Sequence, residues 1–169
     1  SKNVILEILP EEGARISRYS LKINNNTFQL LRPLNTKFPI NKYLLQKLSF
    51  PLVPFSNRIN KGEFTFQGRQ IKLPLNFSPE PHAIHGHGWE QEWKVCEFNR
   101  YSAILEYEYF PNEWPFQYLA RQIFELDSSN LSITIQIKNT GKSPMPAGLG
   151  FHPYFIRTQN SFITAETKK

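Results

Sequence analysis

The sequence has one cysteine and one methionine among its 169 residues. Because Cys96 is alone, the chain cannot form an internal disulfide, which favours a reducing compartment such as the cytoplasm. No apolar run approaches the length needed to cross a bilayer, and the N-terminus lacks the basic-then-apolar pattern of a signal peptide. These absences predict a soluble, cytoplasmic protein.

Clustered positive charge is also absent, although the formal net charge is +6. The 20 lysine and arginine residues are scattered along the chain, and their longest run is the terminal pair Lys168 and Lys169. Recognition of a nucleic-acid backbone requires a clustered basic patch. We therefore predict a mildly basic solvated surface, with no nucleic-acid partner and no membrane partner.

Aromatic residues and proline are abundant, with 14 Phe, 7 Tyr and 13 Pro, a composition that favours strands and ordered loops over helices. Apolar and polar residues alternate along several segments, such as LSITIQIKN, which predicts half-buried antiparallel strands. The predicted elements are strands over residues 3–9, 18–24, 101–110, 117–126 and 131–139, a hairpin over 63–73 that turns at Gly68–Arg69, and one short helix over 41–48.

The chain shows no linker and no change in composition that would divide it into domains. We therefore expect one mostly antiparallel β domain over residues 1–169, with long loops rich in proline and glycine that carry the function. Beyond Phe155, residues 161–166 resemble the beginning of another strand, and the sequence then stops without a cap or polar tail. This ending predicts a fold that is incomplete at its C-terminal end.

His152 lies in the segment GLGFHPYF, between glycines and a proline. It follows the strand predicted over residues 131–139 and a turn rich in proline and glycine, so we expect it at the mouth of a sheet. The glycines allow another group to approach closely, and Pro153 fixes the backbone that follows. Because histidine exchanges protons near neutral pH, His152 fits a proton-transfer role as well as that of a buried, hydrogen-bonded core residue.

The other three histidines lie within the segment HAIHGHG. If this segment is extended, His85 and His87 share one face, which is the geometry of a metal-binding pair. With Glu92 they resemble the first motif of the cupins, a family of metal-dependent β-barrel enzymes, although Pro79 replaces the first glycine of that motif. A metal-dependent cupin-like enzyme is therefore one alternative, and exposed loop positions for His82 and His87 are a simpler one.

The loop PLVPFSNRIN carries Asn57 and Arg58. An amide offers a donor and an acceptor, and a guanidinium offers a rigid fork of donors that suits vicinal hydroxyls as well as carboxylates. Arg58 also fits the role of a structural clamp on loop carbonyl groups. Trp89, Trp93 and Trp114 lie near these loops, where they could stack on a sugar ring, although core packing is the commoner fate of tryptophan.

Four segments in order along the chain resemble the aldose 1-epimerase (galactose mutarotase) family: PFSNRINKGEFTFQG, AIHGHGWEQEWKV, WPFQYLARQIFEL and NTGKSPMPAGLGFHPYF. They span roughly residues 51–155, and four ordered segments are far more specific than any single motif. Members of that family fold as a large antiparallel β-sandwich. The resemblance therefore implies an all-β, galactose mutarotase-like β-sandwich, here truncated.

In that family a glutamate takes the proton of the anomeric hydroxyl while a histidine protonates the ring oxygen, so that the sugar ring opens and closes again as the other anomer. The resemblance implies that His152 is the general acid and that His85 holds the ring oxygen or a neighbouring hydroxyl. It implies that Asn57 and Arg58 bind hydroxyl groups of an aldohexose or related sugar. It also implies chemistry without a metal or any other cofactor.

The catalytic glutamate of the family, and an aspartate that binds the sugar, lie beyond the segment that corresponds to HPYF. Their motifs are absent here, and neither Glu166 nor Asp127 matches them. Neither role is assigned to the acidic residues of the loops, Glu80, Glu90, Glu92 and Glu113. The chain is then a piece of a longer epimerase, a non-catalytic sugar-binding module, or a chain that completes its sheet by pairing with a second copy through unpaired strand edges.

Overall fold

The computed structural model describes residues 3–35, 48–127 and 130–166, and within them strands predominate. The strands are β1 (Val4–Leu9), β2 (Arg15–Ile23), β3 (Asn26–Gln29), β4 (Phe50–Leu52), β5 (Arg58–Ile59), β6 (Glu63–Phe66), β7 (Arg69–Lys72), β8 (Ala83–Ile84), β9 (Lys94–Phe98), β10 (Ser102–Tyr109), β11 (Tyr118–Leu126), β12 (Leu131–Asn139) and β13 (Gly150–His152). The short 3₁₀ helices are η1 (Pro10–Glu12), η2 (Asn60–Gly62) and η3 (Gly88–Glu90). No helix in these ranges is long and apolar enough to cross a membrane.

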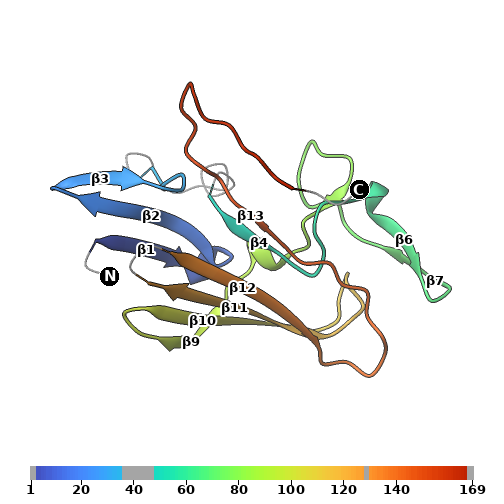
Figure 1. Cartoon of the computed structure of the whole chain (residues 1–169). Helices are drawn as coiled ribbons and strands as arrows, with labels where there is room; N and C mark the ends of the chain where they lie inside the picture. The colour runs from blue at the N-terminus through green and yellow to red at the C-terminus, as the bar shows by residue number, and fades with distance from the viewer. Residues whose placement is uncertain (1–2, 36–47, 128–129, 167–169) are drawn as a thin grey trace.

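Two antiparallel sheets form the body of the molecule (Figure 1). One has the order β1-β2-β3 and the other the order β12-β11-β10-β9, so strands that follow each other in sequence lie side by side. Along β12 partly buried and exposed side chains alternate from residue to residue. The strands predicted from such alternation are confirmed for β1, β10, β11 and β12, to within one residue at each end.

The two sheets pack against each other on a shared core. Ile16 of β2 belongs to the same buried cluster as Leu105 of β10 and Ala120 and Phe124 of β11. Apolar side chains from the inner faces of both sheets therefore exclude water between them, which is the defining feature of a β-sandwich. The all-β, antiparallel sandwich predicted from the sequence is confirmed.

One predicted strand starts earlier than expected, and the one predicted helix lies almost wholly outside the described residues. The strand predicted to start at residue 18 begins at Arg15, because Arg15 and Ile16 continue the pairing with β1 past a bulge between Glu7 and Ile8. The helix predicted over residues 41–48 falls outside the described residues except for Leu48, which is buried.

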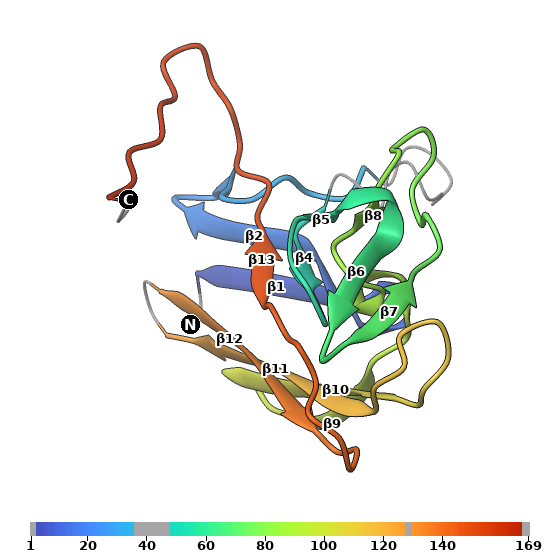
Figure 2. The ribbon, with the colours of Figure 1, turned by 90° about the vertical axis from the view of Figure 1, so that its right-hand side faces the viewer.

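Three short strand pairs, β4–β13, β5–β8 and β6–β7, lie beside the body (Figure 2). The pair β6–β7 is the hairpin predicted over residues 63–73. Its turn consists of Gln67 and Gly68 and not of Gly68–Arg69 as predicted. Both turn residues have positive φ angles, 48° and 75°, which a two-residue type I′ turn requires and which match the twist of the flanking strands.

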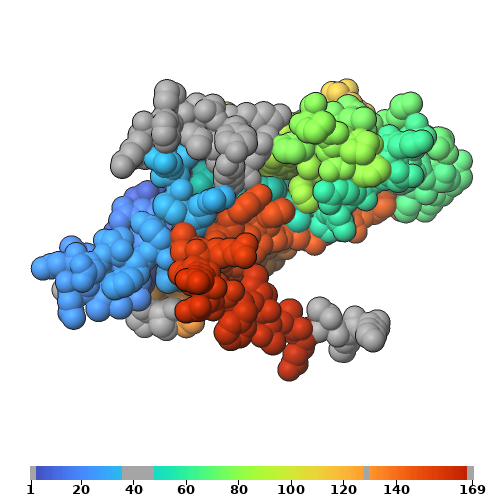
Figure 3. Space-filling view, turned by 90° about the horizontal axis from the view of Figure 1, so that it is seen from above, coloured from blue at the N-terminus to red at the C-terminus, as the bar shows by residue number. Residues whose placement is uncertain are grey.

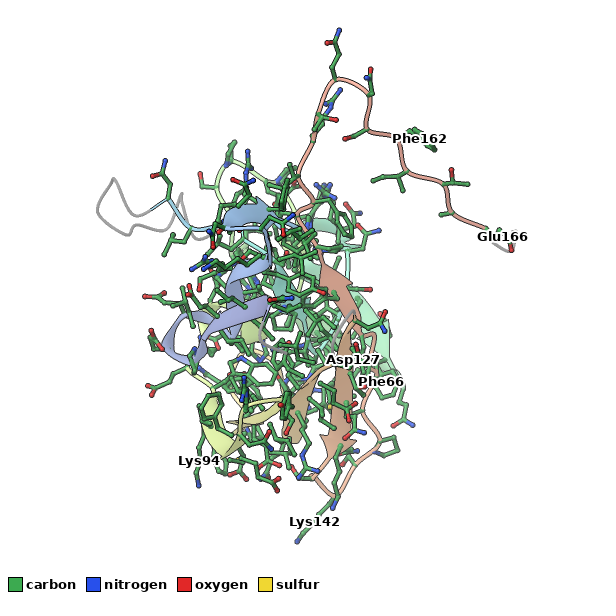
Figure 4. All side chains as sticks on the ribbon, turned by 60° about the vertical axis from the view of Figure 1, so that its left-hand side comes forward. Phe66, Lys94, Asp127, Lys142, Phe162 and Glu166 are labelled. Atoms are coloured by element: carbon green, nitrogen blue, oxygen red, sulfur yellow. The ribbon has the colours of Figure 1, made fainter. Side chains whose placement is uncertain are left out.

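The strand predicted over residues 161–166 is wrong. This segment has no regular secondary structure and pairs with no strand of the described chain. Beyond Phe155, which still pairs with Leu31, the chain runs away from the body (Figures 3 and 4), and Phe162, which lies on this projecting part, is 86% exposed. Extended backbone becomes a strand only where a neighbouring strand supplies hydrogen-bond partners, and no described strand lies beside residues 161–166.

Candidate functional site

Strand pairing brings together residues that are far apart in the sequence. The antiparallel pair β4–β13 places Phe50 opposite His152. The pair β5–β8 places Arg58 opposite the residue that precedes His85, and the backbone N–H of His85 donates to the carbonyl oxygen of Asn57 at 2.9 Å. The structure therefore gathers all four predicted site residues, although their roles stay predictions.

The backbone around His85 turns sharply. His85 and Asn57 have left-handed φ angles of 62° and 61°, which asparagine and histidine adopt more readily than most other residues. Gly86 follows with φ 70°, and a Cβ at this position would lie 2.0 Å from the carbonyl oxygen of Val53. Only glycine fits so close to another backbone. The HAIHGHG segment is therefore not an extended strand over its whole length.

The two imidazoles of His85 and His152 lie in contact. Their ring centroids are 5.3 Å apart and the rings are nearly perpendicular, at 80°. The Nδ1 atoms of both rings are buried and form no hydrogen bond with any described residue. Two buried ring nitrogens without partners are unusual, because buried polar atoms in folded proteins are nearly always hydrogen-bonded.

An aromatic layer supports this histidine pair. Phe50 stacks on His152 with centroids 4.9 Å apart and lies edge-on to His85 at 6.0 Å, while Tyr154 stacks on His152 at 4.9 Å. Trp89 stacks in turn on Phe50 at 5.1 Å. These contacts fix the orientation of both imidazoles without using their nitrogens.

Arg15 lies behind the aromatic layer and is only 3% exposed. Its guanidinium is 4.8 Å from the ring of Phe50 and 5.2 Å from that of Trp89, and its Nη2 donates to the carbonyl oxygen of Trp89 at 2.7 Å. Burial lowers the pKa of Arg15 to about 10, so the side chain stays charged at neutral pH. Arg15 was not predicted as a site residue, since nothing in its local sequence pattern marks an arginine that will be buried.

Burial also sets the charge of the histidine pair. It lowers the pKa of His85 to about 4, with the positive charges of protonated His152 and Arg58 acting in the same direction. Burial likewise lowers the pKa of His152. Both rings are therefore neutral at pH 7 in the described chain, and each offers one donor and one acceptor nitrogen.

Glu80 is a carboxylate at the site that the sequence analysis left unassigned. Arg58 donates from Nη2 to Oε2 of Glu80 at 3.1 Å, and this bond holds the pKa of Glu80 below its ordinary value. The negative charge of Glu80 also acts on His85, where it favours the protonated form. Its position between two prolines, five residues before His85, was the signal available in the sequence.

His87 does not share a face with His85, so the structure does not support the alternative of a metal-binding pair. Its Nε2 lies 2.7 Å from the hydroxyl oxygen of Tyr118, and its ring contacts Tyr109 with centroids 4.3 Å apart. The left-handed backbone at His85 breaks the alternation on which the shared face depended. Across the described residues, no group of three or more His, Cys, Asp or Glu side chains could hold a metal ion.

Of the simpler interpretation of His82 and His87, the loop positions are confirmed, but both residues are partly buried and not exposed. The Nδ1 atom of His82 accepts a hydrogen bond from the backbone N–H of Lys61 at 3.2 Å. All three tryptophans near the loops, Trp89, Trp93 and Trp114, are buried, so core packing is their main role.

A sequence model of the aldose 1-epimerase family matches residues 7–169. The chain belongs to this family. The uncharacterized protein YphB of Escherichia coli (strain K12) is 36% identical over 117 residues, which cover 69% of this chain and 40% of YphB. The resemblance to the aldose 1-epimerases inferred from four sequence segments is thereby confirmed.

Solved structures of this family share the fold. A crystal structure from Escherichia coli K12, provisionally named an aldose 1-epimerase, is 31% identical with a TM-score of 0.76, over 90% of this chain and 49% of that one. A galactose mutarotase-like protein from Clostridium acetobutylicum has a TM-score of 0.74 at 21% identity, over 89% of this chain and 47% of that one. The chain thus spans about half the length of these aldose 1-epimerase relatives.

Proposed function

We propose that this chain carries the histidine-bearing part of a carbohydrate epimerase site that interconverts the α and β anomers of an aldohexose. The observation that supports this most strongly is the contact between His85 and His152, whose ring centroids are 5.3 Å apart although the two residues are far apart in the sequence. Asn57 and Arg58 lie next to the pair and would bind the sugar hydroxyls.

The proposed reaction moves two protons. A base takes the proton of the anomeric hydroxyl, the bond between C1 and the ring oxygen breaks, and its electron pair stays on the ring oxygen, which takes a proton from His152. His85 holds the ring oxygen or a neighbouring hydroxyl. The aldehyde carbon then rotates, and the reverse steps close the ring as the other anomer. Each proton-transfer group contributes on the order of 10²–10⁴-fold to the rate.

The reaction requires a carboxylate near the histidines. His152 donates a proton most effectively as an imidazolium, but burial lowers its pKa. A carboxylate beside the pair would take the anomeric proton and would also favour the imidazolium form. The family motif for this glutamate is absent from the sequence, and Glu80 is already bonded to Arg58. The proposal therefore includes a carboxylate from a further polypeptide segment.

The free edges of the four-stranded sheet are where such a segment would dock. Within the described chain, β12 and β9 are the outer strands of this sheet. Unpaired strand edges form backbone hydrogen bonds readily with another chain. We propose that this segment is a C-terminal region of the family type or a second copy of the chain. Light scattering after size exclusion tests the second copy, which requires twice the mass of 19.8 kDa.

Polarimetry on freshly dissolved α-D-glucose and α-D-galactose tests the proposed activity. We expect the protein to accelerate the approach to anomeric equilibrium, and His152→Ala to remove this acceleration. His82→Ala is the matched control, because that histidine lies outside the pair. Acceleration that persists unchanged in His152→Ala would contradict the proposed role.

A non-catalytic sugar-binding module is the second candidate, because burial keeps the imidazoles of His85 and His152 neutral at pH 7. In that case sugar would change the tryptophan fluorescence saturably, since the ring centroids of Trp89 and His85 are 6.4 Å apart. Polarimetry would then show no acceleration of the anomeric equilibrium. The cupin-like alternative has lost its basis, because His85 and His87 lie in different surroundings.

A further inference from the structure

A cavity of about 210 Å³ is lined by His87 but by neither His85 nor His152. Its apolar walls come mainly from aromatic side chains, and four further polar side chains complete it. The aromatic residues are Phe55, Tyr107, Tyr109 and Trp114, and the polar ones are Asn76, Gln91, Asn112 and Glu113. The cavity is therefore separate from the histidine pair and has a chemistry of its own.

The walls of this cavity are held by hydrogen bonds. Asn76 uses its whole amide on the backbone, donating to the carbonyl oxygens of Ile84 and Gly86 and accepting from the N–H of Ile84 at 2.9 Å. His87 is fixed by the hydroxyl of Tyr118, and the hydroxyl oxygen of Tyr109 accepts from the backbone N–H of Trp114 at 3.2 Å. A ligand would meet a preformed site and not one that has to be ordered on binding.

Three polar side chains at the cavity have no hydrogen bonds of their own. Gln91, Asn112 and Glu113 are exposed, and their side chains form no hydrogen bond with any other described residue. The carboxylate of Glu113 is near enough to Tyr109 to raise the pKa of that hydroxyl, in addition to the larger effect of burial. These groups supply both donors and acceptors beside aromatic walls.

The size and charge of the cavity limit its ligand. A cavity of about 150 Å³ accommodates benzene, so this one admits a single six-membered ring. No lysine or arginine lines it, and Glu113 would repel an anion, which disfavours phosphorylated or acidic ligands. An organic cation would use the aromatic rings and Glu113 but would leave the two amides without a role.

We propose that this cavity is a second binding site, for a single neutral sugar ring. The C–H faces of the ring would contact the walls formed by Tyr107, Tyr109 and Trp114, and its hydroxyls would bond with Gln91, Asn112 and Glu113. This site requires no proton transfer, so it is independent of the proposed epimerase reaction.

Titration of the isotope-labelled protein with methyl β-D-galactopyranoside tests the proposal, because this glycoside has a locked anomeric centre. We expect the indole N–H signal of Trp114 to shift saturably, and the same shift to persist in His152→Ala. The double variant Gln91→Ala/Asn112→Ala should weaken this binding about tenfold through two lost hydrogen bonds. Gln136→Ala is the matched control, since that exposed amide lies on β12 and outside the cavity.

Two results would overturn the second site. One is a titration in which only the signals of His85 and His152 move while that of Trp114 stays still. The other is tighter binding of tetramethylammonium than of the glycoside, lost in Glu113→Gln, which would assign the cavity to an organic cation. Loss of binding at the histidine pair alone would count against the proposed function and leave the second site intact. Well-dispersed spectra of the surface variants show that they are folded.

Discussion

His85 and His87 are separated by one glycine and lie in contrasting surroundings. His85 contacts a second imidazole and has a buried Nδ1 without a partner, whereas Nε2 of His87 is bonded to Tyr118. Burial lowers the pKa of each to about 4. The pKa therefore does not distinguish a candidate chemical group from a structural one. The two histidines are distinguished by their hydrogen bonds, because Nε2 of His87 has a partner within the fold and Nδ1 of His85 has none.

The largest expected effect concerns the aromatic layer behind His85 and His152. Phe50→Ala removes a ring that contacts both imidazoles, and we expect it to lower the free energy of unfolding by about 3–5 kcal/mol and to abolish sugar binding at the pair. Urea denaturation and titration with a methyl glycoside measure the two effects. Phe98→Ala is the control, because that ring is 80% exposed and should change stability by less than about 0.5 kcal/mol.

Gly86→Ala tests the backbone that separates the two histidines. Its new Cβ would meet the carbonyl oxygen of Val53, so we expect a loss of about 3 kcal/mol in the free energy of unfolding. Gly68→Ala has a similar φ of 75° but meets nothing within 4 Å, and should cost only about 1 kcal/mol. If thermal or urea unfolding showed equal losses of stability for Gly86→Ala and Gly68→Ala, the close contact between residue 86 and the carbonyl oxygen of Val53 would make no contribution.

The pH dependence of stability tests whether His87 is buried as a neutral ring. The pKa of His87 falls from about 6.5 in the unfolded chain to about 4 in the folded one, so the unfolded state binds more protons between these values. Stability from the neutral ring is therefore full above pH 6.5 and declines as the pH falls towards 4, by about 2–3 kcal/mol. Urea denaturation at pH 7.5 and 4.5 measures this decline, which should be smaller in His87→Phe. An identical decline in both proteins would exclude His87 as its source.

Tyr118→Phe addresses the partner that sets His87 apart. Removing the hydroxyl leaves a buried imidazole nitrogen unsatisfied, so we expect a loss of about 1–2 kcal/mol in the free energy of unfolding. Binding at His85 and His152 should be unchanged. Tyr101→Phe, at an exposed side chain, serves as the control. A loss of sugar binding at the pair in Tyr118→Phe would mean that the two environments are coupled.

The smallest effect is expected at the ion pair of Arg58 and Glu80, whose side chains are 50% and 18% exposed. Glu80→Gln keeps the shape of the side chain and removes only its charge, so the midpoint of urea denaturation should hardly move. Sugar affinity should fall severalfold, because Arg58 loses the partner that orients it. Unchanged affinity, measured by calorimetry, would remove Glu80 from the site.

Much of the body followed from the sequence, because alternation along β10, β11 and β12 reflects one buried and one exposed face. The strand expected over residues 161–166 failed because a strand needs a neighbour, which a local pattern does not reveal. The turn between β6 and β7 was misplaced by one residue for a related reason, since sheet twist selects the turn type.

The site was predictable in its residues but not in their surroundings. Motif resemblance supplied His85, His152, Asn57 and Arg58, and the fold brings them together. Arg15 and Glu80 were missed because their contacts with Trp89 and Arg58 span 74 and 22 residues. The alternative of a metal-binding pair failed because left-handed backbone at His85 and Gly86 breaks the alternation that would place His85 and His87 on one face.

Imidazole ¹⁵N spectra of the protein during titration with methyl β-D-galactopyranoside test the central claim most directly. The glycoside cannot ring-open, so binding is measured apart from turnover. The account predicts that the ring nitrogens of His85 and His152 shift together, with one dissociation constant, and that both shifts are lost in His152→Ala. Ring nitrogens that remain unchanged at saturating sugar, or two histidines that respond with different dissociation constants, would contradict it.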